Sequence, residues 1–296
     1  MTSWIKTISL MAALSGLVLF VGYILGGTSV LIFAGIIVGL MNFVMYWFSG
    51  SLALAMAGAK QVSEKDEPRL HAIVAEVARR ANLPKPKVYI VNNDSPNAFA
   101  TGRDPKHAVV AVTTGIRRIL TDQELEGVLA HEMGHVKNHD MLTMTVVAVL
   151  AGIISFLAQM AMFSMIFGGG RRDSRDNNMF AMVGVILAIV LMPIAASLIR
   201  FAISRTREYS ADSTGAHIIN DPLPLASALE KLDNAVRIKP MKATAGTEAM
   251  AHMYIVNPLA AHQDKDAQGT SQFASLFSTH PPIHDRIKRL RSMAMG

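Results

Sequence analysis

Residues 131–135, His131-Glu132-Met133-Gly134-His135, form an HExxH motif, which indicates both the fold and the chemistry of this chain. Four residues make about one helical turn, so on a helix both imidazoles project from one face and can hold one Zn²⁺ ion. Glu132 lies beside them, where it can take a proton from the attacking water instead of binding the metal. The motif therefore predicts a zinc hydrolase, with His131 and His135 as metal ligands and Glu132 as the catalytic residue.

The residues before the motif predict the start of a helix. Thr121-Asp122-Gln123-Glu124 has the pattern of a capping box, with a threonine N-cap and a glutamate three residues later. No proline interrupts the chain from there to His135. The motif is therefore expected in the middle of a helix, where the two histidines keep their spacing.

The composition is too apolar for an ordinary soluble domain. Of the 296 residues, 51% are hydrophobic and 17% are charged, and the mean hydropathy is +0.33. The apolar residues fall in long segments without a charge, each longer than the roughly 20 residues that cross a bilayer as a helix. Four transmembrane helices are predicted, near residues 7–26, 30–48, 145–167 and 178–199.

Two other interpretations of the apolar segments remain open. Residues 1–26 could form a signal peptide, because Lys6 precedes the apolar stretch, although no small-residue cleavage site ends it. The pair within 141–199 could form a buried hairpin or a re-entrant segment instead of crossing fully. The lengths favour spanning, and the Gly-Gly-Thr-Ser sequence of residues 26–29 is then the turn of the first pair.

The expected fold is a mainly α membrane protein with a divided catalytic domain. Residues 1–59 and 141–199 form the transmembrane helix pairs. Residues 60–140 carry the HExxH helix, and residues 200–296 carry the rest of an α+β catalytic domain with a small sheet. An even number of spans places both polar parts on the same side of the membrane.

The distribution of basic residues predicts that this side is the cytoplasm. Cytoplasmic flanks of membrane spans are rich in lysine and arginine. The loop 168–177 on the opposite side has three arginines and two aspartates. The catalytic side has Lys6, Lys60, Lys65, Arg69, Lys137, Arg200, Arg205 and Arg207. The net charge of +6 is thereby explained by contact with a membrane surface, and no nucleic-acid motif is present.

A catalytic zinc site needs a third protein ligand, and a water molecule takes the fourth position. His139 is a poor candidate, because on a straight helix it lies about 12 Å from His131. If the HExxH helix runs on into the third span and the fourth span continues through Asp212, Glu208 reaches the level of the histidines. The heights are roughly 12 Å above the membrane for Glu208, and roughly 13 and 8 Å for His131 and His135. Glu208 is therefore the predicted third ligand.

Asp212 lies one helical turn beyond Glu208, on the side of His131. A carboxylate at this position can accept the free ring N–H of His131 and fix its tautomer. In the competing interpretation, Glu208 and Asp212 form surface ion pairs with Arg205 and Arg207 and have no part in a site.

Taken together, these residues resemble a known family, the HtpX-type membrane zinc metalloproteases, in the gluzincin group that also holds the CAAX prenyl endopeptidases. The resemblance covers nearly the whole chain, including the amino-terminal hydrophobic pair. Its ordered motifs are 97–102 (Asn-Ala-Phe-Ala-Thr-Gly), 131–135, Glu208-xxx-Asp212 and 278–282 (Ser-Thr-His-Pro-Pro). It implies one Zn²⁺ per chain on His131, His135 and Glu208, with Glu132 catalytic and Asp212 behind a ligand.

The resemblance also implies a zincin-like (gluzincin) domain, in which a short sheet lies beside the HExxH helix and its edge strand pairs with extended substrate. Residues 87–92 and 108–113 read as strands, with 97–101 as a third. Asn97 and Ala98 are the candidates for the substrate-binding edge. A purely structural strand is an equal alternative.

Two features near the carboxyl end have open roles. His280 precedes two prolines that hold it in an extended turn. The resemblance suggests that it stabilises the transition state as an oxyanion donor, and a histidine that only supports the domain is the alternative. The segment 240–277, rich in Gly, Ala, Ser and Gln, looks like a mobile insertion that covers the cleft or is partly disordered.

The predicted function is zinc endoproteolysis at a membrane. The resemblance implies quality control in the bacterial inner membrane, with cleavage of cytoplasmic segments of misfolded or damaged membrane proteins, beside other membrane proteases. A CAAX-type processing peptidase shares the chemistry, but its additional spans are missing. A zinc-binding scaffold without activity would have lost a site residue, and none is lost. A zinc transporter is disfavoured because the predicted spans contain no Asp, Glu or His.

Overall fold

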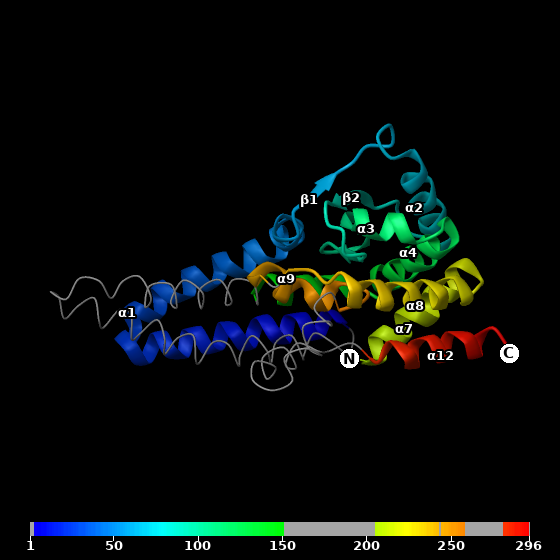
Figure 1. The fold of residues 1–296 in the computed structure, drawn as a ribbon. Helices are drawn as coiled ribbons and strands as arrows, with labels where there is room; N and C mark the ends of the chain where they lie inside the picture. Colours follow the sequence, from blue (N-terminus) through cyan, green and yellow to red (C-terminus); the bar gives the residue numbers. More distant parts are fainter. Residues whose placement is uncertain (1–2, 151–204, 243, 258–280, 296) are drawn as a thin grey trace, which may run out of the picture.

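The structure of the chain is a computed structural model that describes residues 3–150, 205–242, 244–257 and 281–295. This part is mostly helical and contains one small mixed sheet (Figure 1). Most of the predicted spans 145–167 and 178–199 lies outside the described residues, and so does His280. The division of the chain into two helix pairs and a two-part catalytic domain therefore stays a prediction.

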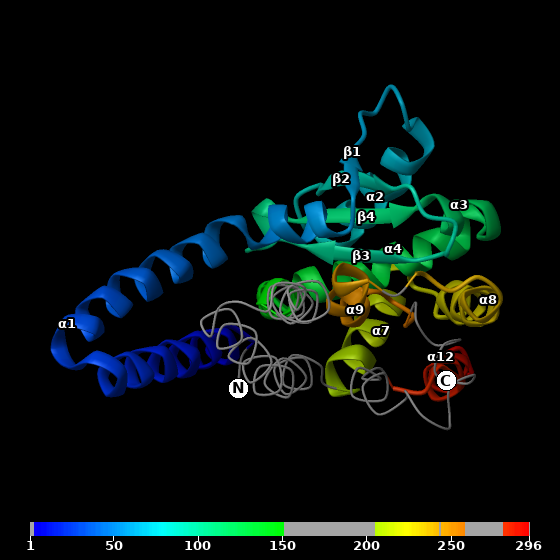
Figure 2. The ribbon, with the colours of Figure 1, turned by 60° about the vertical axis from the view of Figure 1, so that its left-hand side comes forward.

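Helix α1 (Ser3–Met56) doubles back on itself, although its backbone is helical throughout (Figures 1 and 2). The two arms are joined by a hydrogen bond of 3.0 Å from Asn42 Nδ2 to Ser15 Oγ. Positions 15 and 42 are equidistant from residues 28 and 29, so the reversal falls at the predicted turn, as a bend in a helix and not as a loop. Among the described residues, Gly35–Met56 is the helix long and apolar enough to cross a membrane.

The carboxyl-terminal turns of α1 pack against the sheet, beside β1 (Ala59–Gln61) and β3 (Ala98–Thr101). Ala53 is fully buried, and Gly50 faces Gly102 so closely that a Cβ on Gly50 would lie 3.5 Å from the Gly102 Cα. The helix therefore continues past the predicted end of the second span, 30–48, because its last turns contact protein.

The sheet has the strand order β1-β2-β4-β3. The central strands β2 (Lys87–Val91) and β4 (Val109–Thr113) are parallel. The edge strands β1 (Ala59–Gln61) and β3 (Ala98–Thr101) are antiparallel to their neighbours. The three predicted strands are confirmed, with bounds that differ by one residue. The sequence does not predict β1, because three residues are too few to show an alternating pattern.

Helix α4 (Asp122–Lys137) is the central element of the domain and is buried along most of its length. Its predicted capping box is confirmed, because the Thr121 N–H donates to Glu124 Oε2 at 2.8 Å and the Thr121 hydroxyl accepts the Glu124 N–H. The elements that pack against α4 are β3, α2 (Pro68–Ala81), α7 (Arg205–Ile219) and α8 (Leu223–Ile238) (Figure 2). The remaining elements are α3 (Thr114–Ile119), η1 (Pro105–His107), α9 (Ala245–Met250), η2 (Ala251–Met253) and α12 (Ile283–Met293).

The expectation that α4 runs straight into the third span is wrong. His139 adopts a left-handed conformation, with φ of 58°. The Asp140 N–H donates to the His135 carbonyl at 3.0 Å and the His139 N–H donates to the Val136 carbonyl at 3.2 Å, which is the pattern of a Schellman motif. A separate apolar helix then begins at Met141 and is described to Leu150. The sequence does not predict this break, because His139 occupies the left-handed position after the helix, where glycine is usual.

The prediction of a mobile insertion at 240–277 is wrong for most of the part that the structure describes. Helix α9 and η2 lie in this segment, and residues 249–256 are all buried. The Tyr254 ring packs edge-on against Phe99 of β3, with 5.3 Å between the ring centroids. Isolated hydrophobic residues in a sequence biased toward small and polar types thus complete the core beside β3.

Candidate active site

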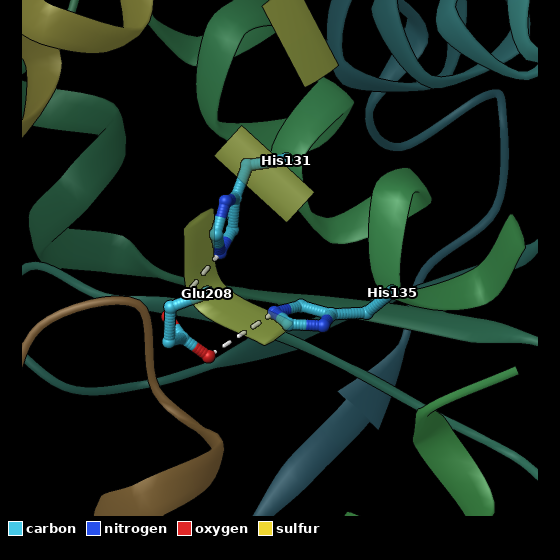
Figure 3. Close-up of side chains that lie close together, drawn as sticks. All are labelled: His131, His135 and Glu208. Carbon is cyan, nitrogen blue, oxygen red and sulfur yellow. Dashed lines mark ion pairs between the residues drawn. The ribbon is translucent and has the colours of Figure 1, made fainter. Parts of the chain in front are cut away.

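His131 and His135 of α4 converge with Glu208 of α7 (Figure 3). One ligand atom from each residue lies within 4.8 Å of the others, and all three side chains are buried. His135 Nε2 is 3.5 Å from Glu208 Oε1, and His131 Nε2 is 3.9 Å from Glu208 Oε2. Both rings therefore present Nε2 to the same carboxylate.

The donor set and its spacing fit a tetrahedral zinc ion. Ligand atoms that are each about 2.1 Å from a tetrahedral Zn²⁺ lie about 3.4 Å apart. The two histidine–carboxylate separations, 3.5 Å to Oε1 and 3.9 Å to Oε2, are close to this value, and one ligand atom from each of the three residues lies within 4.8 Å of the others. Two imidazoles and one carboxylate also form a common ligand set of catalytic zinc, in which the fourth position is left for water. His131, His135 and Glu208 could therefore hold this metal together.

Helices α4 and α7 approach closely because glycines lie at their contact. A Cβ on Gly215 would lie 2.8 Å from the His131 amide nitrogen, and a Cβ on Gly134 would lie 2.9 Å from the Ala211 carbonyl oxygen. A side chain at either position would have to push the two backbones apart. This contact brings Glu208 within reach of the two histidines.

Glu132 points toward β3 and is 2% exposed. Its Oε2 accepts a hydrogen bond of 2.8 Å from the Ala100 N–H. Burial raises the pKa of Glu132 to about 8, against a smaller opposing effect of His135. A carboxyl group with a pKa near neutrality can accept a proton and return it, as a general base requires.

Asp212 contacts His131 from the side opposite to Glu208. Its Oδ1 lies 2.9 Å from His131 Nδ1, so the Nδ1–H donates to the carboxylate and Nε2 is left to face Glu208. This is the contact that the helical spacing of Glu208 and Asp212 leads one to expect. The competing interpretation of surface ion pairs does not hold, because both carboxylates are buried.

Two further charged residues, Asp140 and Arg286, complete the surroundings, and no sequence motif predicts either of them. Asp140 Oδ2 lies 3.4 Å from His135 Nδ1. Although burial acts in the opposite direction, Asp140 and Glu208 raise the pKa of His135 to about 10. Arg286 of α12 is fully buried and donates two hydrogen bonds to Asp212. Asp140 reaches His135 only because of the turn after α4, and nothing in the basic sequence of α12 distinguishes Arg286 from an exposed arginine.

The candidates for a substrate-binding edge lie on an edge strand, but this edge is covered. Asn97 and Ala98 are both fully buried. Asn97 Nδ2 donates to the Val256 carbonyl at 2.7 Å, and the Ala98 carbonyl accepts the Ile255 N–H at 3.2 Å. His139 belongs to the turn after α4, and it is not one of the three clustered ligand candidates.

The chain has extensive similarity to known proteases, which confirms the resemblance to the HtpX type. The sequence profile of peptidase family M48 matches residues 64–294. A "Protease HtpX homolog" of Pyrococcus furiosus is 51% identical over 292 residues, which cover 99% of this chain and 96% of the relative. A second one, of Persephonella marina, is 49% identical over 291 residues, which cover 98% and 97%.

Similarity to a solved structure is more distant. The crystal structure of S. mikatae Ste24p aligns with 97% of this chain and 64% of its own, with 18% sequence identity and a TM-score of 0.48. The sequence similarity and the geometry of the histidine–glutamate cluster carry the assignment. The chain belongs to peptidase family M48 and is a zinc metalloprotease.

Proposed function

We propose that this metalloprotease is anchored in a membrane and cleaves cytoplasmic segments of misfolded or damaged membrane proteins. In this proposal His131, His135 and Glu208 hold one Zn²⁺ ion and Glu132 is the catalytic residue. Bound there, zinc would polarise the scissile carbonyl and increase the acidity of water. The observation that carries the proposal is the short path from Glu132 to the apolar helix α1.

The path runs along β3. The Ala100 N–H donates to Glu132 at 2.8 Å, and Gly102, two residues further along, packs against Gly50 of α1. Two residues of a strand span about 7 Å, so Glu132 lies within about 15 Å of α1. Substrate segments must therefore come close to the membrane surface to be cut.

Aromatic residues indicate where α1 meets that surface. The exposed aromatic side chains in this part of the helix are Phe43, Tyr46, Trp47 and Phe48. Trp and Tyr are enriched where spans meet the headgroup region. The guanidinium of Arg103, which follows Gly102, lies 4.4 Å from the ring centroid of Trp47. This contact supports the proposal that the loop after β3, next to the residues that contact Glu132, lies near the membrane surface.

The surrounding residues have distinct tasks in peptide hydrolysis. Glu132 accepts a proton from the attacking water and passes it to the leaving amine, while the Ala100 N–H holds its carboxylate beside β3. Asp212 and Asp140 accept the Nδ1–H groups of His131 and His135, so that Nε2 of each ring is free to bind metal.

The proposed location is the plasma membrane, with the catalytic domain on the cytoplasmic side. The excess of lysine and arginine on the catalytic side of the predicted spans supports this orientation. The relatives come from an archaeon and from a bacterium, so the similarity does not assign the chain to the bacterial inner membrane. Other membrane quality-control proteases are the proposed partners.

The test compares two substrates of the chain reconstituted in vesicles with zinc. One is an unfolded segment attached to a transmembrane anchor, and the other is the same segment free in solution. We expect faster cleavage of the anchored segment, with all cleavage lost in Glu132→Gln while zinc remains bound. Equal activity of the variant would show that Glu132 is not the catalytic residue, or that another protease contaminates the sample.

The same assay separates the two alternatives. A CAAX-type processing peptidase would cut a prenylated carboxyl-terminal peptide in preference to its unprenylated copy. A zinc-binding scaffold without activity would bind one zinc ion per chain and cut none of the substrates. Equal cleavage of the anchored and the free segment would retain the peptidase but contradict its restriction to substrates at the membrane.

A further inference from the structure

We propose that Arg286 is a positioning residue of the active site, which holds the Asp212 carboxylate against His131 and thereby aims the Nε2 of His131 at the metal position. This inference rests on the proposed function, in which His131 is a zinc ligand. It concerns a residue that lies on α12, 155 residues after His131 in the sequence.

The guanidinium of Arg286 donates hydrogen bonds to both carboxylate oxygens of Asp212. Nε donates to Oδ2 at 2.9 Å and Nη2 donates to Oδ1 at 2.7 Å, which is a bidentate pair. Oδ1 also accepts the Nδ1–H of His131 at 2.9 Å. Because two parallel hydrogen bonds prevent rotation of the carboxylate, Oδ1 stays in the direction that fixes the His131 ring.

Arg286 itself is fixed by its other neighbours. Its side chain is fully buried, and Nη1 donates to the Ile255 carbonyl at 3.0 Å. Nη1 also lies 3.5 Å from Glu208 Oε2, so its charge offsets two buried carboxylates, Glu208 and Asp212. Nη2 is 3.4 Å from His131 Nδ1, but no hydrogen bond joins the two, because the Nδ1–H already donates to Asp212 and both nitrogens are then donors.

An arginine in this arrangement acts through Asp212 and not by touching substrate. Groups that orient a metal-ligating histidine typically contribute a factor of about 10 to 100 in metal affinity. If Arg286 works only by holding Asp212, its removal should have little further effect once Asp212 no longer fixes His131. A role in packing alone would leave the two effects independent.

The experiment is a double-mutant cycle with Arg286→Gln, Asp212→Asn and the double variant in the full chain. Zinc affinity is measured by competition with a chromogenic chelator, and the ligand geometry by the visible absorption of the Co²⁺-substituted chain. We expect each single variant to weaken zinc binding about 10- to 100-fold and to change the cobalt spectrum, and the double variant to be no weaker than the worse single variant. Fully additive losses would overturn the inference, and so would zinc binding by Arg286→Gln within twofold of the unchanged chain.

A matched control exists on the same helix. The Arg291 guanidinium donates to Glu230 Oε2 at 2.8 Å, so Arg291→Gln removes a contact between α12 and α8 that involves no residue of the site. It should keep both zinc affinity and cobalt spectrum. Loss of zinc in this variant as large as in Arg286→Gln would reduce Arg286 to a residue that docks α12, and would overturn the inference.

A lysine variant addresses the risk that Arg286→Gln fails to fold. Arg286→Lys retains the charge but cannot form the two parallel bonds to Asp212. A positioning role predicts that Lys leaves zinc binding weakened and the cobalt spectrum altered, whereas wild-type behaviour of this variant would overturn it. Because the readout is metal binding, an unchanged chain that binds zinc and cuts nothing would contradict the proposed function without touching this inference.

Discussion

The close contact of α4 and α7 gives the sharpest prediction, through Gly215→Ala. The new Cβ would lie 2.8 and 2.9 Å from the amide nitrogen and Cα of His131 and 3.0 Å from the Ala130 carbonyl carbon. Ordinary Cβ contacts begin at 3.4 Å, so the shortest of these contacts falls 0.6 Å short. Backbone atoms in a helix cannot turn aside, and the two helices must therefore separate by about this amount.

The separation acts on zinc binding more than on stability. Overpacking costs about 1–3 kcal/mol, and the better helix propensity of alanine returns about 1 kcal/mol. Zinc–ligand distances, in contrast, are set within about 0.2 Å, and Glu208 lies on α7 while both histidines lie on α4. We expect a loss of about 0–2 kcal/mol in unfolding free energy and at least a tenfold loss in zinc affinity.

The assay pairs chelator competition with thermal unfolding of the zinc-free chain. Gly39→Ala on α1 is the control, because its new Cβ has no atom within 4 Å, so it should leave zinc affinity unchanged and raise stability by at most about 1 kcal/mol through helix propensity. If Gly215→Ala binds zinc as tightly as the unchanged chain, the contact of α4 with α7 does not set the ligand geometry and the reasoning is refuted.

Three other perturbations test separate parts of the structure. Hydrogen bonds from neighbouring Lys, Ser and Thr side chains outweigh burial and lower the pKa of Glu124 to about 2, from 4.5. Its ionised form should thus contribute roughly 2–3 kcal/mol to the free energy of unfolding above pH 4.5, and this contribution is lost as the pH falls toward 2. Denaturation should therefore show that Glu124→Gln is less stable than the unchanged chain at pH 6, and that the two stabilities converge near pH 2. Asp140→Asn should weaken zinc binding about 10-fold or more, measured by chelator competition, because a neutral amide replaces the charged acceptor of the His135 Nδ1–H; unchanged affinity would contradict this role. If β3 is the substrate-binding edge, a disulfide between Ala98→Cys and Ile255→Cys in this cysteine-free chain should stop cleavage until it is reduced, and a cross-linked chain with full activity would show that substrate binds elsewhere.

Local sequence patterns predict the centre of the site well. The spacing of His131 and His135 and the capping box that starts their helix depend only on contacts within about four residues. Helical arithmetic also predicts Glu208 and Asp212 near the histidines, and the structure brings them together, although the assumption of an unbroken helix beyond His135 is wrong. The assumption does little harm because both histidines precede the break at His139.

Long-range contacts explain what the sequence does not show. Arg286 stands among the basic residues of α12, and only its contact with Asp212 of α7 makes it a buried residue. Residues 249–256 have no helical or alternating periodicity, because they form the end of α9, a 3₁₀ turn and an irregular stretch that packs on β3. Because this segment has no recognisable pattern, the sequence predicts an open edge at β3. In the structure, Ile255 and Val256 cover this edge.

The central claim is that His131, His135 and Glu208 hold one catalytic zinc ion. The most direct measurement is the zinc content and zinc affinity of three purified chains, which are the unchanged protein, Glu208→Gln and Glu132→Gln. We expect one tightly bound zinc per chain in the unchanged protein and in Glu132→Gln, and at least a tenfold weaker affinity in Glu208→Gln. A Glu208→Gln chain that keeps one zinc ion with unchanged affinity would contradict the claim.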